Sequence, residues 1–279
     1  MEKLDVLGKD YSKLSDKKLY LFDMDGTIYL DNDLFEGVDQ FLKSIKSRGG
    51  RYVFITNNSS KSVIDYVKKL HKLGLDYVTE EDFFTSAQSA IRLFKAKFGD
   101  KLIYAQGTKS FIKGLKDGGL NVTEEFDENA EAVLVGFDPE LTGEKLRNTC
   151  KMLTLFDIPY YATNPDWVCP VDFGYIPDCG SMCFGIEKAT GKKPIYIGKP
   201  EPAMIFSVME KFGFHKEDTV VFGDRIYTDI ASGYNAGVDT VLVLSGEATM
   251  EDVPSAPHKP TYIFDSIKEL GEALKEANK

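Results

Sequence analysis

The sequence predicts an α/β protein in which a parallel sheet is interrupted by an inserted second domain. Three observations support this fold class. Short apolar runs alternate with amphipathic stretches near both ends of the chain, the links between them are short, and the middle carries strands and helices of its own. Such alternation is typical of βαβ units, because parallel strands need crossover connections that are usually helical.

The first part of the chain predicts two strand–helix pairs. We expect a strand at 17–23, a helix at 36–50, a strand at 51–56 and a helix at 60–74. In the first helix, Val38, Phe41, Leu42 and Ile45 recur at helical spacing, and the run ends at Gly-Gly. The second strand, RYVFIT, is rich in β-branched and aromatic residues.

The last part of the chain repeats this pattern. We expect strands at 194–198, 219–224 and 239–244, helices at 201–213 and 228–237, and a strand followed by a helix over 261–277. The middle adds strands at 101–107 and 131–137 and a helix at 142–156. The prediction is therefore a Rossmann-like catalytic core made of residues 1–86 and 191–279. Residues 87–190 form an inserted α/β domain.

Charge and composition limit the partners. The formal net charge of −10 disfavours binding to nucleic acid and to anionic membranes, and local cations must reverse this field wherever a phosphorylated small molecule binds. No apolar run reaches the length of a membrane span, and the first 18 residues lack an apolar signal core, which predicts a cytoplasmic protein. Cys179 and Cys183 could form a metal or redox pair, but no further Cys/His cluster accompanies them, which favours buried thiols.

Acidic side chains follow two of the predicted strands. Asp23 ends the predicted strand 17–23 and Asp25 follows it, while Asp224 ends the predicted strand 219–224 and Asp229 follows it. In parallel α/β sheets, ligands bind at the carboxyl ends of the strands, so we expect these acids to converge. An EF-hand loop is excluded because its required Gly and acid would fall on Ile28 and Leu34. Several carboxylates in one crevice need a divalent cation, and oxygen-only ligands indicate Mg²⁺.

Further polar residues end two other predicted strands. Lys199 follows the strand at 194–198 and can bind a phosphoryl oxygen, although a lone Lys is usually a solvated charge. Thr56 offers a hydroxyl, and the backbone N–H groups of Asn57 and Asn58 precede a helix, which suggests an anion cradle. The alternative for these three residues is a simple polar helix cap.

Four ordered motifs, FDMDGT, ITNNS, GKP and GDRIYTD, resemble those of the haloacid dehalogenase superfamily of aspartate-nucleophile phosphatases. The insertion is similar to the large α/β cap of the NagD-type, p-nitrophenyl phosphatase-like subfamily, and FDPELT (137–142) and 163–181 are similar to patterns of that cap. The resemblance implies a Mg²⁺-dependent phosphatase of small phosphate monoesters. Sugar phosphates, phosphoglycolate, nucleotides, pyridoxal phosphate and p-nitrophenyl phosphate are all compatible substrates.

The resemblance also implies residue roles. Asp23 would form an aspartyl-phosphate, Asp25 would act as general acid and then base, and Thr56 and Lys199 would hold the phosphoryl group. Mg²⁺ would be bound by Asp23, by the backbone carbonyl of Asp25 and by Asp224. Asp229 would belong to the metal site by contacting these ligands rather than the ion. The inserted domain would act as a lid and could form a homodimer surface. Asn164, Asp166 and Trp167 are candidate substrate contacts, although Trp167 could equally be a buried anchor.

Rival functions make different demands on the sequence. A dehalogenase has no leaving alkoxide to protonate, and so has no use for Asp25 or a metal. A phosphonate hydrolase would need a Schiff-base lysine, which no context singles out in the insertion. A non-catalytic phosphometabolite-binding protein predicts a broken set of motifs, yet all the acids and Lys199 are present. Phosphotransferase activity on the same fold stays open as an alternative.

Overall fold

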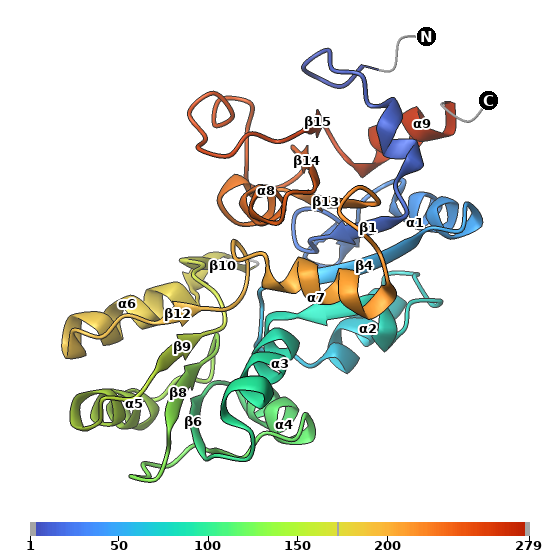
Figure 1. Ribbon diagram of the computed structural model, residues 1–279. Coiled ribbons are helices and arrows are strands. Elements are labelled where there is room, and N and C mark those ends of the chain that lie inside the picture. Colours follow the sequence, from blue (N-terminus) through green and yellow to red (C-terminus); the bar gives the residue numbers. More distant parts are fainter. Residues whose placement is uncertain (1–3, 172, 277–279) are drawn as a thin grey trace. The chain divides into compact units, whose positions relative to one another are not determined.

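The computed structural model describes residues 4–171 and 173–276, and it divides the chain into two compact units (Figure 1). Unit 1 contains 1–55, 67–84 and 199–279, and unit 2 contains 56–66 and 85–198. The boundaries near 84 and 198 differ from the expected 86 and 190, and the short segment 56–66 was expected in the core. Ala277, the end of the helix expected at 261–277, lies outside the described residues.

Unit 1 is built on a six-stranded sheet with the order β15-β14-β13-β1-β4-β5. Its strands are β1 (Leu19–Phe22), β4 (Arg51–Thr56), β5 (Phe83–Thr85), β13 (Thr219–Gly223), β14 (Asp239–Val243) and β15 (Tyr262–Phe264). The pairings from β4 across to β15 are all parallel. From β1 the chain builds outward through β4 on one side, and it returns later through β13 on the other. The strand order therefore reverses between β1 and β13, which is where such sheets bind ligands.

Both faces of β1 are buried, and each face packs on different helices. Helices α1 (Val38–Ser47), α2 (Val63–Lys72), α7 (Ala203–Phe212), α8 (Ala231–Ala236) and α9 (Ile267–Glu276) accompany this sheet along the chain. Tyr20 and Phe22 contact Phe41 of α1, with ring centroids 6.1 and 5.9 Å apart. Leu19 and Leu21 point the other way and share a cluster with Ile205 and other residues of α7. The alternation of strand side chains explains why LYLF is apolar throughout.

A short antiparallel hairpin follows β1. It consists of β2 (Tyr29–Leu30) and β3 (Asp33–Leu34). Elsewhere in unit 1, the 3₁₀ turn η2 (Glu80–Asp82) precedes β5. Gly26, directly after the two acids of the first motif, has a φ of +82°. That conformation favours glycine and turns the chain away from the end of β1.

Residues 5–11, which precede the first strand, pack against the edge strand β15. The buried Asp5 accepts a hydrogen bond from the backbone N–H of Ile263 (3.0 Å), and Val6 N–H donates to Ile263 O (3.2 Å). Tyr11, ahead of the 3₁₀ turn η1 (Ser12–Asp16), packs edge-on against Phe264. The segment thus covers part of a sheet edge that would otherwise expose unpaired backbone groups.

Unit 2 contains a five-stranded parallel sheet with the order β12-β9-β8-β6-β7. Its strands are β6 (Ile103–Gln106), β7 (Val122–Thr123), β8 (Ala132–Val135), β9 (Tyr160–Ala162) and β12 (Ile195–Tyr196), and its helices are α3 (Ser86–Phe98), α4 (Lys109–Asp117), α5 (Gly143–Leu155) and α6 (Cys179–Thr190). A separate antiparallel pair is formed by β10 (Val168–Val171) and β11 (Gly174–Pro177). The expected α/β character of the insertion is confirmed.

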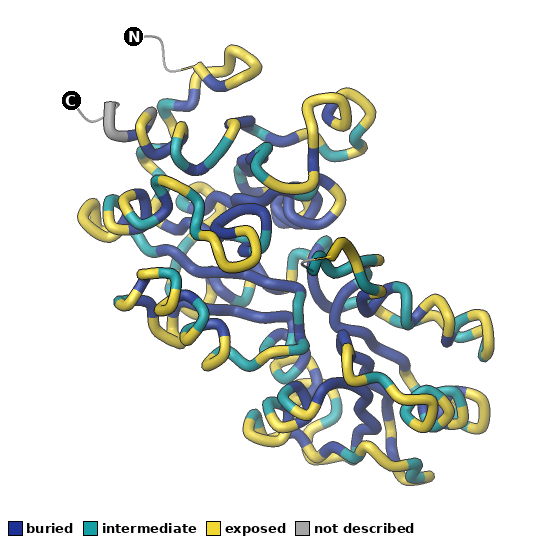
Figure 2. Tube along the Cα trace, turned by 180° about the vertical axis from the view of Figure 1, so that it is seen from behind, coloured by how far each residue is buried: buried dark blue, intermediate teal, exposed yellow. Residues whose placement is uncertain are grey.

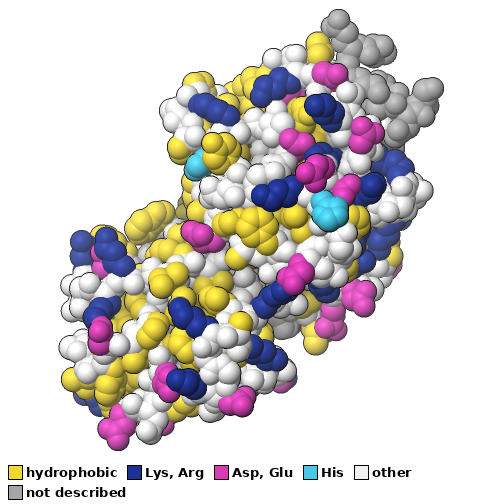
Figure 3. All heavy atoms as spheres, in the orientation of Figure 1, with side chains coloured by type: hydrophobic (Ala, Val, Ile, Leu, Met, Phe, Trp, Pro, Cys, Tyr) yellow, Lys and Arg dark blue, Asp and Glu magenta, His cyan; other side chains and the backbone are white. Residues whose placement is uncertain are grey.

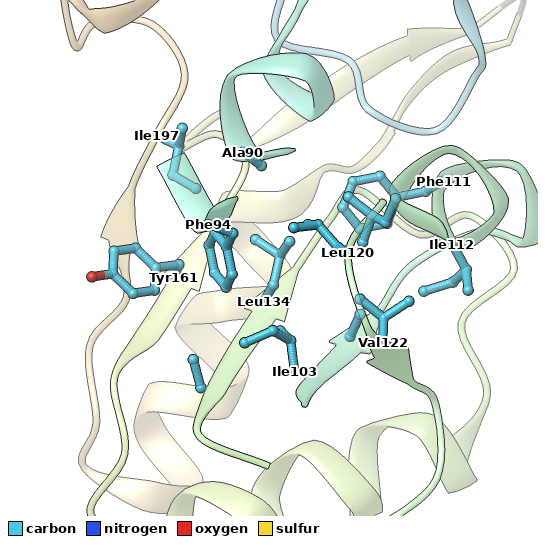
Figure 4. Packing of buried hydrophobic residues seen from close by; sticks show 13 residues of the cluster. Ala90, Phe94, Ile103, Phe111, Ile112, Leu120, Val122, Leu134, Tyr161 and Ile197 are labelled. Carbon is cyan, nitrogen blue, oxygen red and sulfur yellow. The ribbon is translucent and has the colours of Figure 1, made fainter. Parts of the chain in front are cut away.

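Two hydrophobic clusters sandwich this sheet. One contains Phe94 of α3, Phe111 of α4 and Leu134 of β8, and Figure 4 shows these side chains with their neighbours. The other contains Val133 of β8 and Cys183 of α6. Figure 2 shows the buried strands running through the interior, with exposed residues concentrated on helices and loops.

One predicted strand belongs to a different sheet from the one expected. The run 194–198 was assigned to the core, but β12 pairs with β9 of unit 2 through Ile195–Tyr161 and Tyr196–Ala162. A short apolar run does not specify its partner strand. The pairing is extended by Gly198 N–H, which donates to Thr163 O at 2.8 Å. Unit 1 therefore resumes at Lys199, directly after this strand.

The cysteines are free thiols, as the sequence favoured. Cys179 and Cys183 lie one turn apart on α6, both are buried, and their sulfurs are 3.9 Å apart. Burial raises the pKa of the Cys179 thiol, which opposes reactivity.

The surface shows no single dominant charge on the face drawn in Figure 3, where basic and acidic side chains are interspersed. Among the described residues, no helix is long and apolar enough to cross a membrane.

Candidate active site

Two of the predicted acids flank the point where the strand order of unit 1 reverses. Asp23 follows β1, and Asp224 follows β13. These strands are in register, with Phe22 beside Phe222, and Asp23 N–H donates to Phe222 O at 2.8 Å. The parallel pairing therefore brings together two carboxylates from distant parts of the sequence.

Asp229 joins the two strand-end acids from a π-helical turn. The sequence placed it at the start of a helix, but the structure forms the turn η3 (Ile226–Ile230) before α8 begins. π-helical turns are rare and often occur at functional sites. The Asp229 carboxylate accepts the N–H of Arg225 at 3.1 Å. It also lies over Gly223, where an added Cβ would come within 2.2 Å of the Asp229 Cβ.

Lys199 is the cation of the site. Its side chain is only 2% exposed, and its Nζ lies 2.5 Å from Oδ1 of both Asp23 and Asp229. A buried ammonium is costly unless carboxylates surround it, and here two do. The predicted convergence of Asp23, Lys199, Asp224 and Asp229 is therefore present in the structure.

The electrostatics of the cluster follow from its burial. Burial and the neighbouring Asp229 raise the pKa of Asp23, and Lys199 offsets part of this effect. Burial and Asp229 also raise the pKa of Asp224 to about 7. Burial alone would lower the pKa of Lys199, but Asp229 and Asp23 raise it above its ordinary value. The lysine is thus held charged, while ionisation of Asp23 and Asp224 is disfavoured.

The three acids fit a divalent cation. One oxygen from each of Asp23, Asp224 and Asp229 lies within 4.8 Å of the others. Asp224 Oδ1 is buried and has no hydrogen-bond partner among the described residues, whereas Oδ2 accepts Glu247 N–H at 2.8 Å. An unpaired, buried carboxylate oxygen in an all-oxygen cluster is the donor that Mg²⁺ prefers.

Glycines make room for the Asp224 carboxylate. A Cβ at Gly26 would lie 2.4 Å from Asp224 Oδ2, and one at Gly246 would lie 2.1 Å from the same atom. Residues 245–247 were not singled out from the sequence, yet Ser245 also donates to Gly26 O at 2.8 Å. They follow β14, so the rule used for the other strand ends would have found them.

Asp25 does not join the carboxylate cluster. Its side chain is 37% exposed, with Lys69 Nζ 3.8 Å from Oδ1. Tyr29 donates a long hydrogen bond of 3.5 Å to Oδ2. Lys69 also lies over the Tyr29 ring, 3.6 Å from its centroid. No sequence pattern singled out Lys69, because its position on α2 is set by tertiary packing. The Asp25 side chain is thus not among the three described carboxylates that could share a cation.

The TNNSS segment forms a loop and not a helix start. Thr56 is the last residue of β4, and its Oγ1 accepts the N–H of Asn58 at 3.2 Å. Because α2 begins only at Val63, Asn57 and Asn58 do not lie at a helix N-terminus, and the reasoning behind the predicted cradle is wrong. Asn58 instead turns the loop by accepting from both Ser60 N–H and Ser60 Oγ.

The candidate substrate contacts of unit 2 have different surroundings. Asn164 and Asp166 are buried, with exposures of 0% and 4%, and both belong to a hydrogen-bond network inside unit 2. Trp167 is 55% exposed and packs edge-on against Phe184, so it is not a buried anchor. In the described structure, Asn164 and Asp166 contact other protein groups, and their contact with a substrate stays a prediction.

Comparisons with known proteins define the class of this fold and site. Residues 20–121 match the family model of haloacid dehalogenase-like hydrolases, and residues 196–270 match a second, HAD-hydrolase-like model. The chain belongs to the haloacid dehalogenase-like hydrolase family.

Particular relatives cover nearly the whole chain. Ribonucleotide monophosphatase NagD of Escherichia coli (strain K12) is 34% identical over 253 residues, which is 91% of this chain and 98% of the relative. Among solved structures, 4-nitrophenylphosphatase from Thermotoga maritima matches with a TM-score of 0.88 and 40% identity, covering 94% and 99% of the two chains. Glycerol phosphate phosphatase from Mycobacterium tuberculosis, in complex with magnesium, matches with a TM-score of 0.86 and 29% identity, covering 93% and 78%.

Proposed function

We propose that this chain is a Mg²⁺-dependent phosphatase that hydrolyses small phosphate monoesters through a covalent intermediate on Asp23. The observation that carries the proposal is the position of Lys199 Nζ, 2.5 Å from both Asp23 and Asp229, beside a third carboxylate on Asp224. The relatives named as ribonucleotide, 4-nitrophenyl and glycerol phosphate phosphatases support the substrate class.

Asp23 is the proposed nucleophile. One of its carboxylate oxygens attacks phosphorus, a bond to the phosphoryl group forms, and the ester oxygen leaves with the bonding electron pair. A carboxylate and a phosphate repel each other, so positive charge is needed at the point of attack. Lys199 supplies a fixed ammonium there, and it costs no reorganisation when the reaction occurs. Thr56, at the end of the neighbouring strand β4, is proposed to offer its hydroxyl to the phosphoryl group.

Asp23 and Asp224 are the proposed side-chain ligands of Mg²⁺, with the backbone carbonyl of Asp25 as a further ligand. Asp229 holds Lys199 and lies next to both acids. When bound, the ion would neutralise the acids and polarise the phosphoryl oxygens. The magnesium in the glycerol phosphate phosphatase structure supports the choice of metal.

Asp25 is the proposed proton carrier. It gives a proton to the departing alkoxide, and in the second step it takes a proton from the water that attacks phosphorus and releases Asp23. Its partial exposure and its contacts with Tyr29 and Lys69 leave it outside the carboxylate cluster. The two acids of the first motif can therefore have separate roles.

Replacing Asp25 with Asn is expected to slow hydrolysis most for substrates with poor leaving groups. A nitrophenolate leaves without a proton, whereas an alkoxide needs one, so glycerol phosphate should lose roughly 10²–10⁴-fold in kcat. The loss with p-nitrophenyl phosphate should be smaller. The measurement is kcat for both esters in Mg²⁺, with an EDTA-treated sample that should be inactive. Equal losses for both esters would contradict the acid role, and phosphatase activity that is unchanged by EDTA would contradict the metal.

A further inference from the structure

The strand ends of the unit 2 sheet are not open to a ligand, because the chain's own TNNSS segment lies against them. Ser59 Oγ accepts the N–H of Phe137, which follows β8, at 3.0 Å. Thr108, which follows β6 closely, donates its hydroxyl to Ser60 O at 2.9 Å. The carboxyl edge where α/β sheets bind ligands is thus used to hold the segment that starts at Thr56.

A buried chain of hydrogen bonds continues from this segment. Thr163 donates its single hydroxyl proton to Asn164 Oδ1 at 2.9 Å, so Ser59 is the donor in the 3.0 Å contact between Ser59 Oγ and Thr163 Oγ1. The two amide protons of Asn164 then go to Asp166 Oδ2 and Asp178 Oδ1, each at 3.0 Å. The side chains of this network are at most 4% exposed. Buried hydrogen bonds of this kind hold the side chains of the network in place.

Asn57 is where this network meets the phosphoryl-binding residues. Its Nδ2 donates a hydrogen bond to Asp166 Oδ2 at 3.0 Å, and its backbone carbonyl oxygen accepts one from Ser86 Oγ at 2.6 Å. Its Oδ1 lies so close to Gly198 that a Cβ there would approach it to 2.4 Å. Asn57 is therefore fixed at its amide, at its backbone and against Gly198.

The residues next to Asn57 and Gly198 in the sequence are the proposed phosphoryl-binding residues. Asn57 directly follows Thr56, and Gly198 directly precedes Lys199. We propose that Asp166 is a positioning residue: through Asn57 it fixes the backbone on which Thr56 and Lys199 are carried. This inference rests on the proposed function, and it replaces the expectation that Asp166 contacts the substrate. Asp166 Oδ2 already accepts two amide protons in the interior of unit 2.

The test compares Asp166→Ala, Asn57→Ala and the double variant with p-nitrophenyl phosphate in Mg²⁺. A small misplacement of groups that hold a transferred phosphoryl can cost ~10²-fold, so each single variant should lose roughly that factor in kcat. Each should also raise the inhibition constant of inorganic phosphate. Because both variants remove the same hydrogen bond between Asn57 and Asp166, the double variant should be no slower than the slower single variant. A product of the two losses, about 10⁴-fold, would overturn the proposal.

Asp138→Ala is the matched control. Asp138 is a fully buried acid of the same unit, it lies at the same sheet edge, and its carboxylate pairs with Lys145 at 2.9 Å. Its loss should lower the melting temperature but leave kcat and the phosphate inhibition constant per folded molecule unchanged. Wild-type kinetics in Asp166→Ala, or equal losses in Asp138→Ala, would reject the positioning role. If Asp166→Ala does not fold, Asn57→Ala carries the same test from the other side of the contact.

Failure of this inference and failure of the proposed function give different results. An inactive wild-type protein, or an active Asp23→Asn variant, would remove the proposed function itself. An active wild type with an inactive Asp23→Asn variant, together with unaffected kinetics in Asp166→Ala and Asn57→Ala, would remove only the positioning role.

Discussion

Replacing Asp23 with Asn is expected to reduce phosphate ester hydrolysis by roughly 10⁴-fold or more, the scale seen when a covalent nucleophile is removed. The amide has nearly the same shape, but it lacks the charged oxygen that would attack phosphorus. The fold should be retained, because the substitution also removes the repulsion between Asp23 and the acids at 224 and 229. The measurement is kcat for p-nitrophenyl phosphate, together with the melting temperature in EDTA, which should not fall.

Asp39→Asn is the control for this substitution. Asp39 lies on α1 of the same unit, and its carboxylate is partly exposed and pairs with Lys43 at 2.8 Å. We expect full activity, since the pair lies on the surface. Activity of the Asp23→Asn variant within tenfold of wild type would exclude Asp23 as the nucleophile.

Replacing Lys199 with Met is expected to cause the largest loss of stability in unit 1. Methionine nearly preserves the length of the side chain but leaves the carboxylates of Asp23 and Asp229 without their shared cation. Removing one partner of a buried charge pair typically costs about 3–5 kcal/mol. Hydrolysis should also be lost, because the phosphoryl group loses its fixed ammonium. Urea unfolding in EDTA at pH 7.5 measures the first effect, and kcat/KM in Mg²⁺ measures the second.

Two further variants make the Lys199 result specific. Lys43→Met removes an exposed pair on α1 and should cost at most about 1 kcal/mol. Adding Asp229→Asn to Lys199→Met should recover part of the stability, since one uncompensated charge is removed, but it should recover no activity. If Lys199→Met were as stable as wild type in EDTA, the buried charge arrangement described here would be wrong.

The core of the site was predictable because its residues follow a simple local rule. Asp23 and Asp224 come directly after β1 and β13, and such neighbouring parallel strands place these positions at one edge of a sheet. Lys199 also follows a short apolar run, but that strand belongs to the sheet of unit 2, so the rule identified Lys199 without giving the reason for its position. The same rule, applied to the end of β14, would also have identified Ser245 to Glu247. The sequence therefore indicates which residues form the site, but it does not give the distances between them.

What the sequence did not predict depends on long-range pairing. The run 194–198 looks like any other short strand, and only its register with β9 assigns it to unit 2. Asn164 and Asp166 are polar residues in a loop, a pattern that suggests exposure, yet both are buried. Their polar atoms are instead hydrogen-bonded inside unit 2, Asp166 to Asn57 and Asn164 to Asp178. The start of α2 was placed too early, because the polar TNNSS segment continues as a loop to Val63.

The carboxylate cluster predicts a specific dependence of stability on pH. The pKa of Asp23 is raised and that of Asp224 is raised to about 7, so the metal-free native state holds more protons than the unfolded state between about pH 4 and 7. Stability in EDTA must then fall as pH rises through that window, by at most about 1.4 kcal/mol per pH unit for each group. Bound Mg²⁺ should take the place of these protons.

Urea unfolding of the wild-type protein at pH 5 and pH 7.5, in EDTA and in Mg²⁺, tests whether the acids of the cluster share a magnesium ion. We predict that Mg²⁺ raises the free energy of unfolding clearly at pH 7.5 and much less at pH 5, and that Asp224→Asn loses most of the gain. A gain at pH 7.5 that persists in Asp224→Asn, or no gain in the wild type, would contradict the claim that these acids share a magnesium ion beside Lys199.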